Sequence, residues 1–276
     1  MLKLLITMLA FAQSLSAGPV GDALARAVEK ITKGEHQGYP MHVFQLDGIE
    51  CRIVEPRVAA EGNPWLWRAR FWGHEPQFEK AMIDAGWHLA YCDVAGLFGN
   101  DEALGRWDLF HKFATGLGLA DQPFLFGMSR GGLPVMRWAS SRPDQVCGIY
   151  VDNAVMDIRS WPGGKGTGKG SPEDWQVCLK AYGLTDASAA GFADGPLDRL
   201  EPLAKAKVPV LALINEADDV VPPAENGDLL EERYRKLGGP IEVIRRPGLG
   251  HHPHSLKDPA PIVSFAHKSW SDRPGR

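Results

Sequence analysis

This sequence of 276 residues lacks several features that would exclude a compact enzyme. It has no excess of positive charge, because 30 lysines and arginines stand against 34 aspartates and glutamates, for a formal net charge of −4. Nucleic acid is therefore not expected as a partner, since its phosphates demand a basic surface. With 31 glycines, 21 prolines and 44% hydrophobic residues, the chain also lacks the composition of low-complexity or disordered proteins.

Hydrophobic runs long enough to cross a membrane are also missing, so no stable membrane insertion is expected. The most apolar stretch is N-terminal, where Lys3 precedes an almost wholly apolar run over residues 4–15 and small residues follow up to Ala17. This arrangement is typical of a secretory signal peptide over residues 1–17, the alternative being an uncleaved helix docked on the fold. Residues 18–276 are then expected to form a single domain that is secreted or periplasmic.

Cysteine is scarce, with four residues in the whole chain. In an exported protein these four could form two disulfides. However, Cys51, Cys92 and Cys147 lie inside apolar, strand-like runs, where a free thiol behaves as a small buried hydrophobic group. We therefore favour buried thiols, and no cysteine spacing indicates a metal site.

Short apolar runs alternate with helix-like segments along most of the chain. Eight segments are expected to be strands: residues 42–46, 50–54, 65–71, 88–94, 124–128, 146–151, 208–214 and 241–244. Helices are expected over residues 76–85, 101–115, 130–141, 223–237 and 262–270. An opening hairpin followed by strand–helix units predicts an α/β fold, in which helices flank a mostly parallel eight-strand sheet.

Residues 154–207 interrupt this alternation. They hold no clear strand, and so long a connection inside a compact domain is usually a lid or an inserted subdomain. We expect an inserted lid there, after the sixth strand. Its glycine run at 163–170 looks like a phosphate-binding loop, but Gly170 follows Lys169 where such a loop needs Ser or Thr, so no nucleotide is expected.

The strongest chemical signal is the pentapeptide Gly127-Met128-Ser129-Arg130-Gly131, a Gly-x-Ser-x-Gly pattern between an expected strand and an expected helix. Small neighbours permit the sharp turn that exposes a serine hydroxyl above the sheet. The start of the following helix offers N–H groups and a positive dipole end to a developing oxyanion. Ser129 is therefore the candidate nucleophile.

A serine nucleophile needs a base to take its proton. His251 follows the last expected strand, and Asp218 follows the strand before it, within residues 215–222. The chain order serine, acid, histidine is that of the α/β-hydrolase fold. The sequence resembles the α/β-hydrolase family over nearly all of its mature length, most of all the exported bacterial members described as esterase-like or prolyl-oligopeptidase-like.

The resemblance implies Ser129 as nucleophile, His251 as general base and then acid, and Asp218 as the carboxylate that orients His251. The acid motif of the family commonly reads Gly-x-x-Asp, whereas Asn215 stands here in place of the glycine. That departure keeps the neighbouring Asp219 open as an alternative acid. A further alternative is Asp152, because some family members carry their acid at the end of the corresponding strand.

The resemblance also implies an oxyanion hole made of two backbone N–H groups, those of Arg130 and of Trp72, with Gly73 as the alternative to Trp72. One of the nine tryptophans, Trp161, lies in the expected lid, where an aromatic ring has less core to fill. We therefore name Trp161 as a substrate-binding residue, since flat rings are common in sugar sites.

His252 and His254 lie close to His251 in the sequence, and the three could be taken for a metal cluster. Histidines so close in sequence are expected to point in different directions, so no metal is expected.

These features predict a secreted serine hydrolase that cleaves a carboxylic ester through an acyl-enzyme intermediate, with no cofactor. The expected substrate is a small-molecule or polysaccharide ester, and export together with the lid tryptophans supports a carbohydrate ester without establishing it. Two alternatives remain. One is a prolyl-oligopeptidase-type peptidase that uses the same residues on an amide, and the other is a non-catalytic, carbohydrate-binding hydrolase homologue.

Overall fold

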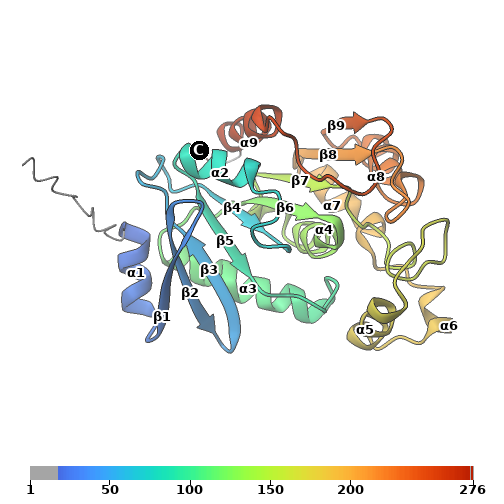
Figure 1. The fold of residues 1–276 in the computed structure, drawn as a ribbon, viewed down its shortest axis with the longest axis horizontal. Coiled ribbons are helices and arrows are strands. Elements are labelled where there is room, and N and C mark those ends of the chain that lie inside the picture. Colours follow the sequence, from blue (N-terminus) through green and yellow to red (C-terminus); the bar gives the residue numbers. More distant parts are fainter. Residues whose placement is uncertain (1–17, 274, 276) are drawn as a thin grey trace, which may run out of the picture.

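The structure, a computed structural model, describes residues 18–273 and residue 275. The predicted signal peptide, residues 1–17, lies outside these residues. Nine strands in the described part of the chain form one sheet, in the order β1-β2-β3-β5-β4-β6-β7-β8-β9 (Figure 1). Their bounds are β1 Ile31–His36, β2 Tyr39–Leu46, β3 Ile49–Val54, β4 Trp65–Arg68, β5 His88–Cys92, β6 Phe124–Met128, β7 Gly148–Asp152, β8 Val210–Asn215 and β9 Ile241–Arg246.

The first strands of the sheet pair in the antiparallel sense, from β1 through β2 and β3 to β5. All other pairs, from β5 through β4 to β9, are parallel. A parallel pair needs a crossover connection, and the helices between the strands provide it. The fold is therefore α/β with a mostly parallel sheet, as the alternation of strand-like and helix-like segments predicts.

The prediction of eight strands was wrong, because the described residues contain nine. The additional strand is β1, in which four of the six side chains are exposed. A polar strand at the edge of a sheet has no alternation of apolar residues by which the sequence could reveal it. Residues 154–207 consequently follow the seventh strand, β7, and not the sixth.

Helices cover both faces of the sheet (Figure 1). Their bounds are α1 Pro19–Ala27, α2 Gln77–Asp84, α3 Asp101–Gly116, α4 Gly132–Ser141, α5 Pro172–Tyr182, α6 Asp186–Ala189, α7 Leu200–Lys205, α8 Gly227–Lys236 and α9 Ala260–Ser271. The helices α1, α3, α4, α7 and α8 share one hydrophobic core with the sheet, while α2 and α9 pack on the opposite face. No helix in the described ranges is both long enough and apolar enough to span a membrane.

Stacked tryptophans fix α3 and α4 on the sheet. The ring of Trp67 lies 5.1 Å from that of Trp65, 4.2 Å from that of Trp107 and 5.1 Å from that of Trp138. All four side chains are fully buried. Because buried aromatic rings contribute large apolar areas, this cluster holds α3 and α4 firmly against β4.

The segment between β7 and β8 carries α5 and α6, which lie at the side of the molecule toward which the central strands point (Figure 1). Trp161 and Trp175 of this segment belong to a small hydrophobic cluster that also includes Phe98, Leu133 and Val221 from outside it. It is tied to the main body by hydrogen bonds from Asn100 to the Ala181 carbonyl (2.6 Å) and from the Tyr182 hydroxyl to the Phe98 carbonyl (2.8 Å). It therefore packs beside the carboxyl ends of the strands, where the sites of open α/β sheets lie.

All four cysteines are buried free thiols. This confirms the preference for buried thiols, which the apolar runs around Cys51, Cys92 and Cys147 supported. Cys51 and Cys92 are register partners across β3 and β5. Burial raises the pKa of the Cys178 thiol to about 12.

Candidate active site

Ser129 occupies the turn between β6 and α4, and its φ of 49° lies in the left-handed region. Residues other than glycine rarely adopt this conformation, so the turn is strained. A Cβ added at Gly127 would lie 2.7 Å from the Gly131 carbonyl oxygen, and one at Gly132 would lie 2.6 Å from the Ala154 Cβ. The turn therefore closes only because glycine occupies these positions.

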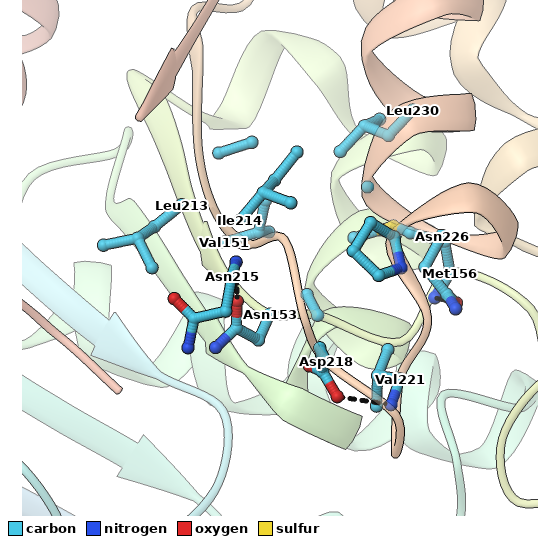
Figure 2. A pocket seen from close by; sticks show the side chains of 14 residues that line it. Val151, Asn153, Met156, Leu213, Ile214, Asn215, Asp218, Val221, Asn226 and Leu230 are labelled. Carbon is cyan, nitrogen blue, oxygen red and sulfur yellow. Dashed lines mark hydrogen bonds between the residues drawn. The ribbon is translucent and has the colours of Figure 1, made fainter. Parts of the chain in front are cut away.

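Three side chains that follow the ends of different strands form one hydrogen-bonded chain. The Ser129 hydroxyl donates to His251 Nε2 over 3.0 Å, and His251 Nδ1 donates to Asp218 Oδ2 over 2.7 Å. The other carboxylate oxygen, Oδ1, accepts from the N–H groups of Val220 (2.9 Å) and Val221 (2.8 Å), the latter drawn in Figure 2. These contacts hold Asp218 in one orientation, and all three members of the chain are at most 8% exposed.

Asp219, the first alternative acid, points away from this chain. Its carboxylate is exposed and pairs with Lys169, and this contact lowers the pKa of Asp219. The structure therefore brings Asp218 to His251 and leaves Asp219 at the surface.

Asp152, the second alternative acid, faces a different histidine. This fully buried carboxylate accepts from His254 Nδ1 (2.9 Å), from the Ser255 N–H (2.6 Å) and from the Tyr150 hydroxyl (2.6 Å). Burial, together with the neighbouring Asp152 carboxylate, holds the pKa of Tyr150 well above its ordinary value. Asp152 thus anchors the loop that continues from His251 and does not touch His251 itself.

Two asparagines fix the backbone on either side of His251. Asn153 donates to the His251 carbonyl (3.1 Å) and accepts from the Asn215 N–H (2.8 Å), and the two amides lie together in Figure 2. Asn215 in turn donates to the Gly250 carbonyl (2.6 Å) and accepts from Arg246 Nε (2.7 Å). Asn153 was not among the predicted site residues, although its place directly after a buried strand was a signal in the sequence.

The loop after β4, which carries Trp72, is held by a buried arginine. Arg68 Nε donates to the Arg70 carbonyl (2.6 Å), and its Nη2 donates to the His74 carbonyl (2.8 Å). Its remaining terminal nitrogen pairs with Glu79, which is fully buried on α2. The backbone of this loop is thus fixed by one side chain that the sequence analysis did not identify.

The two proposed oxyanion donors lie on neighbouring segments. Arg130 belongs to the first turn after the nucleophile. The N–H groups of a first helical turn have no hydrogen-bond acceptor within the helix, so they are available to an oxyanion. The Trp72 loop packs against this turn, since a Cβ added at Gly131 would lie 3.5 Å from the Arg70 Cβ. The Trp72 ring itself faces away toward β5, 5.7 Å from the ring of Tyr91.

The Arg130 side chain reaches the segment between β7 and β8. Its Nη1 pairs with Asp174 over 2.9 Å, and its Cζ lies 4.6 Å from the ring centre of Trp161. Burial lowers the pKa of the Arg130 guanidinium, although Asp174 opposes this effect. Trp161 also packs against Phe98 and is 7% exposed, so much of its ring contacts protein.

The ligating nitrogens of His251, His252 and His254 lie within 4.8 Å of one another, closer than the sequence analysis expected. Two of the three positions are already explained by hydrogen bonds. His251 contacts Ser129 and a carboxylate, and His254 donates to a second carboxylate. These contacts account for the arrangement without an ion, and we assign no metal role to it.

No protein-family model matches the chain, and no curated protein matches its sequence. Similar solved structures include a puromycin-hydrolyzing peptidase from Mycobacterium tuberculosis (TM-score 0.62, 15% identity, 86% of this chain and 38% of the peptidase). They also include an S-formylglutathione hydrolase from Agrobacterium tumefaciens (TM-score 0.61, 15% identity, 89% of this chain and 100% of the hydrolase). A third is Est1E from Butyrivibrio proteoclasticus (TM-score 0.59, 17% identity, 88% of this chain and 99% of Est1E).

These similarities establish the fold: the chain has the α/β-hydrolase fold, with a central, mostly parallel sheet flanked by helices. The chain spans less than two fifths of the length of the peptidase but all of the S-formylglutathione hydrolase.

Proposed function

We propose that this protein is a serine hydrolase that cleaves carboxylic esters through an acyl-enzyme intermediate. The observation that carries the proposal is the hydrogen-bonded chain of Ser129, His251 and Asp218, whose serine stands on a strained turn at the start of a helix. A serine, a base and an orienting acid within hydrogen-bond reach are the arrangement that activates a hydroxyl for acyl transfer.

In this mechanism the Ser129 oxygen attacks the ester carbonyl while its proton moves to His251 Nε2. Asp218 keeps the second imidazole proton on Nδ1 and stabilises the imidazolium that forms. The N–H groups of Arg130 and Trp72 receive the negative charge that develops on the carbonyl oxygen. His251 then protonates the leaving alcohol, and a water molecule that gives its proton to His251 releases the acid from the acyl-enzyme.

The proposal extends to substrate and location. A carbohydrate ester is the proposed substrate, with Trp161 as one wall of its site and residues 154–207 as the lid. Secretion or a periplasmic location is proposed from the N-terminal segment, and sequencing the N-terminus of the protein exported by its native host tests it. A chain that begins near Gly18 would support cleavage, and one that begins at Met1 would contradict it.

The test of the activity is hydrolysis of short-chain 4-nitrophenyl esters by the wild type, by Ser129→Ala and by Ser141→Ala. The last variant is the matched control, because the Ser141 hydroxyl, at the far end of α4, donates only to the Arg137 carbonyl. We expect turnover by the wild type and the control, and loss of at least about 10³-fold in Ser129→Ala.

A fluorophosphonate probe provides a second readout, because it labels an activated serine whatever the substrate. Labelling of Ser129 together with cleavage of proline-containing peptides, but not of esters, would favour the peptidase alternative suggested by the structural similarity to a peptidase. A folded protein that neither turns over esters nor takes the label would contradict the proposal and favour the binding homologue.

A further inference from the structure

Two arginines, Arg70 and Arg130, line the same small concavity beside the turn that carries the proposed nucleophile. The Cζ atoms of Arg70 and Arg130 lie 5.4 Å and 5.8 Å from the centre of the same ring, that of Phe71. Arg130 has an acidic partner in Asp174. Arg70 makes no ion pair and no side-chain hydrogen bond with any residue that the structure describes, and its Nε is buried. Within the described part of the chain, the pair therefore carries one positive charge that has no ion-pair partner.

The position of this charge relates it to the proposed chemistry. Arg70 follows β4 by two residues, and its Cβ would lie 3.5 Å from a Cβ added at Gly131, two residues after Ser129. Both arginines line a small concavity between the loops after β4 and β5 and the start of α4, together with Val94, Gly96, Phe98 and Pro134. A ligand group in that concavity would be adjacent to the turn that presents the serine.

The carboxylates around the pair are already engaged. Asp174 accepts from Ser171 as well as from Arg130. Asp93, on the loop after β5, accepts from the Tyr91 hydroxyl (2.8 Å) and from the Ala95 N–H (2.9 Å). Burial lowers the pKa of Arg130, and the like charge of Arg70 acts in the same direction. A bound anion would relieve this repulsion and occupy the free N–H groups of Arg70.

We propose that the ester substrate carries a carboxylate, and that Arg70, beside Arg130, binds this carboxylate while Ser129 attacks the ester bond. The inference rests on the proposed function and names the substrate class for the same site. A guanidinium suits this task because its planar fork can donate two parallel hydrogen bonds to one carboxylate. The substrate class is thus an acidic ester, in which the anion belongs to either the acyl or the alcohol part.

Two matched pairs of esters distinguish these two parts. 4-Nitrophenyl hydrogen succinate and 4-nitrophenyl butyrate differ by a carboxylate on the acyl side, and 4-acetoxybenzoate and its methyl ester differ by one on the alcohol side. The kcat/KM for each pair, corrected for uncatalysed hydrolysis, would be measured in the wild type, Arg70→Gln and Arg70→Lys. Arg57→Gln is the matched control, because it removes one positive charge from an exposed site near Tyr39.

We expect the wild type to prefer the acidic member of at least one pair by about tenfold or more, mainly through a lower KM. Arg70→Gln should lose about 10- to 100-fold in kcat/KM for that acidic ester and change little for the neutral one. Arg70→Lys should recover part of the loss, because it restores charge without the fork. The control should behave as the wild type.

Equal kcat/KM ratios in the wild type and Arg70→Gln for both pairs, with the neutral esters still hydrolysed, would overturn the acidic-ester proposal alone. Absence of turnover on all four esters, together with no fluorophosphonate labelling of Ser129, would instead overturn the proposed function, and this inference with it.

Discussion

Replacing Asp218 with asparagine tests the proposed chemistry most directly, because it exchanges one carboxylate oxygen for an NH2 group and removes the negative charge with almost no change of shape. We expect kcat to fall by about 10³- to 10⁴-fold while the fold is retained. We expect this because the two oxygens of the Asp218 carboxylate have different partners: one accepts from backbone N–H groups and the other from His251.

One oxygen, Oδ1, accepts two backbone N–H groups, those of Val220 and Val221. In the variant the amide oxygen must keep this position, because an NH2 group there would face two donors at less than 3 Å. The amide NH2 group then faces His251 Nδ1, 2.7 Å away in the wild type. It obliges Nδ1 to accept a hydrogen bond and moves the imidazole proton to Nε2.

A proton on Nε2 points at the Ser129 oxygen, which lies 3.0 Å from that nitrogen. Since the histidine can then no longer accept the serine proton, the nucleophile loses its base. A loss of 10⁴-fold corresponds to about 5 kcal/mol of transition-state stabilisation. We expect a loss of kcat this large only for Asp218, because neither of the other two candidate acids contacts His251.

The assay compares kcat on a 4-nitrophenyl ester for Asp218→Asn, Asp219→Asn and Asp152→Asn, alongside the midpoint of thermal unfolding. Asp219→Asn should stay within about threefold of the wild type, since this exposed carboxylate pairs only with Lys169 at the surface. Asp152→Asn should mainly lower the unfolding midpoint, because it disturbs a fully buried carboxylate with three hydrogen-bond donors.

An Asp218→Asn variant that retains kcat within tenfold of the wild type, with an unchanged unfolding midpoint, would refute the role assigned to Asp218. An Asp152→Asn variant that loses as much kcat as Asp218→Asn, while its unfolding midpoint stays constant, would refute it equally. Either result would mean that the orientation of His251 does not depend on Asp218.

Three further expectations concern the rest of the fold. Arg68→Lys keeps a charge beside Glu79 but loses the planar guanidinium that holds the loop after β4. We therefore expect kcat to fall about tenfold and the unfolding midpoint to drop. An unchanged kcat would contradict the role of Arg68 in positioning this loop. Burial lowers the pKa of His88 to about 4. The free energy of unfolding that depends on neutral His88 is therefore complete above about pH 6.5, and about 3 kcal/mol of it is lost when the pH falls to 4. Urea unfolding at both pH values should show a smaller loss of this free energy in His88→Gln than in the wild type. Ellman's reagent should react slowly with the native protein and titrate four thiols in concentrated guanidinium chloride, whereas a lower count would indicate a disulfide.

Much of the fold was predictable because the central strands are buried on both faces. All residues of β5, β6, β7 and β8 are buried, so each is a continuous apolar run in the sequence. The position of Ser129 was predictable for a related reason, since the glycines that permit its turn are close to it in the sequence. The edge strand β1 gave no such signal, and neither did the short helices between β7 and β8.

Side-chain partners from distant elements were not predictable in the same way. Asp218 and Asp219 are adjacent and chemically identical, and only the turn that aims Val220 and Val221 at the Asp218 carboxylate distinguishes them. Arg68 and Glu79 become a pair only when α2 packs against the sheet. Arg70 is a candidate ligand-binding residue because the tertiary structure brings no acidic partner to it among the described residues, and the sequence does not reveal this.

Asn215, which stands where the acid motif of α/β-hydrolases commonly has a glycine, illustrates how the strands set the position of the proposed base. Parallel pairing of β7 with β8 places Asn153 beside Asn215, and pairing of β8 with β9 makes Arg246 the register partner of Asn215. From there the Asn215 amide reaches the Gly250 carbonyl, one residue before His251. A glycine has no side chain and could not make this contact. With asparagine at this position the backbone is less free, but the side chain holds the Gly250 carbonyl. We infer that the base is positioned by the ends of three strands and not by its loop alone, which is why a loop rich in histidine and proline can present His251 in a single orientation.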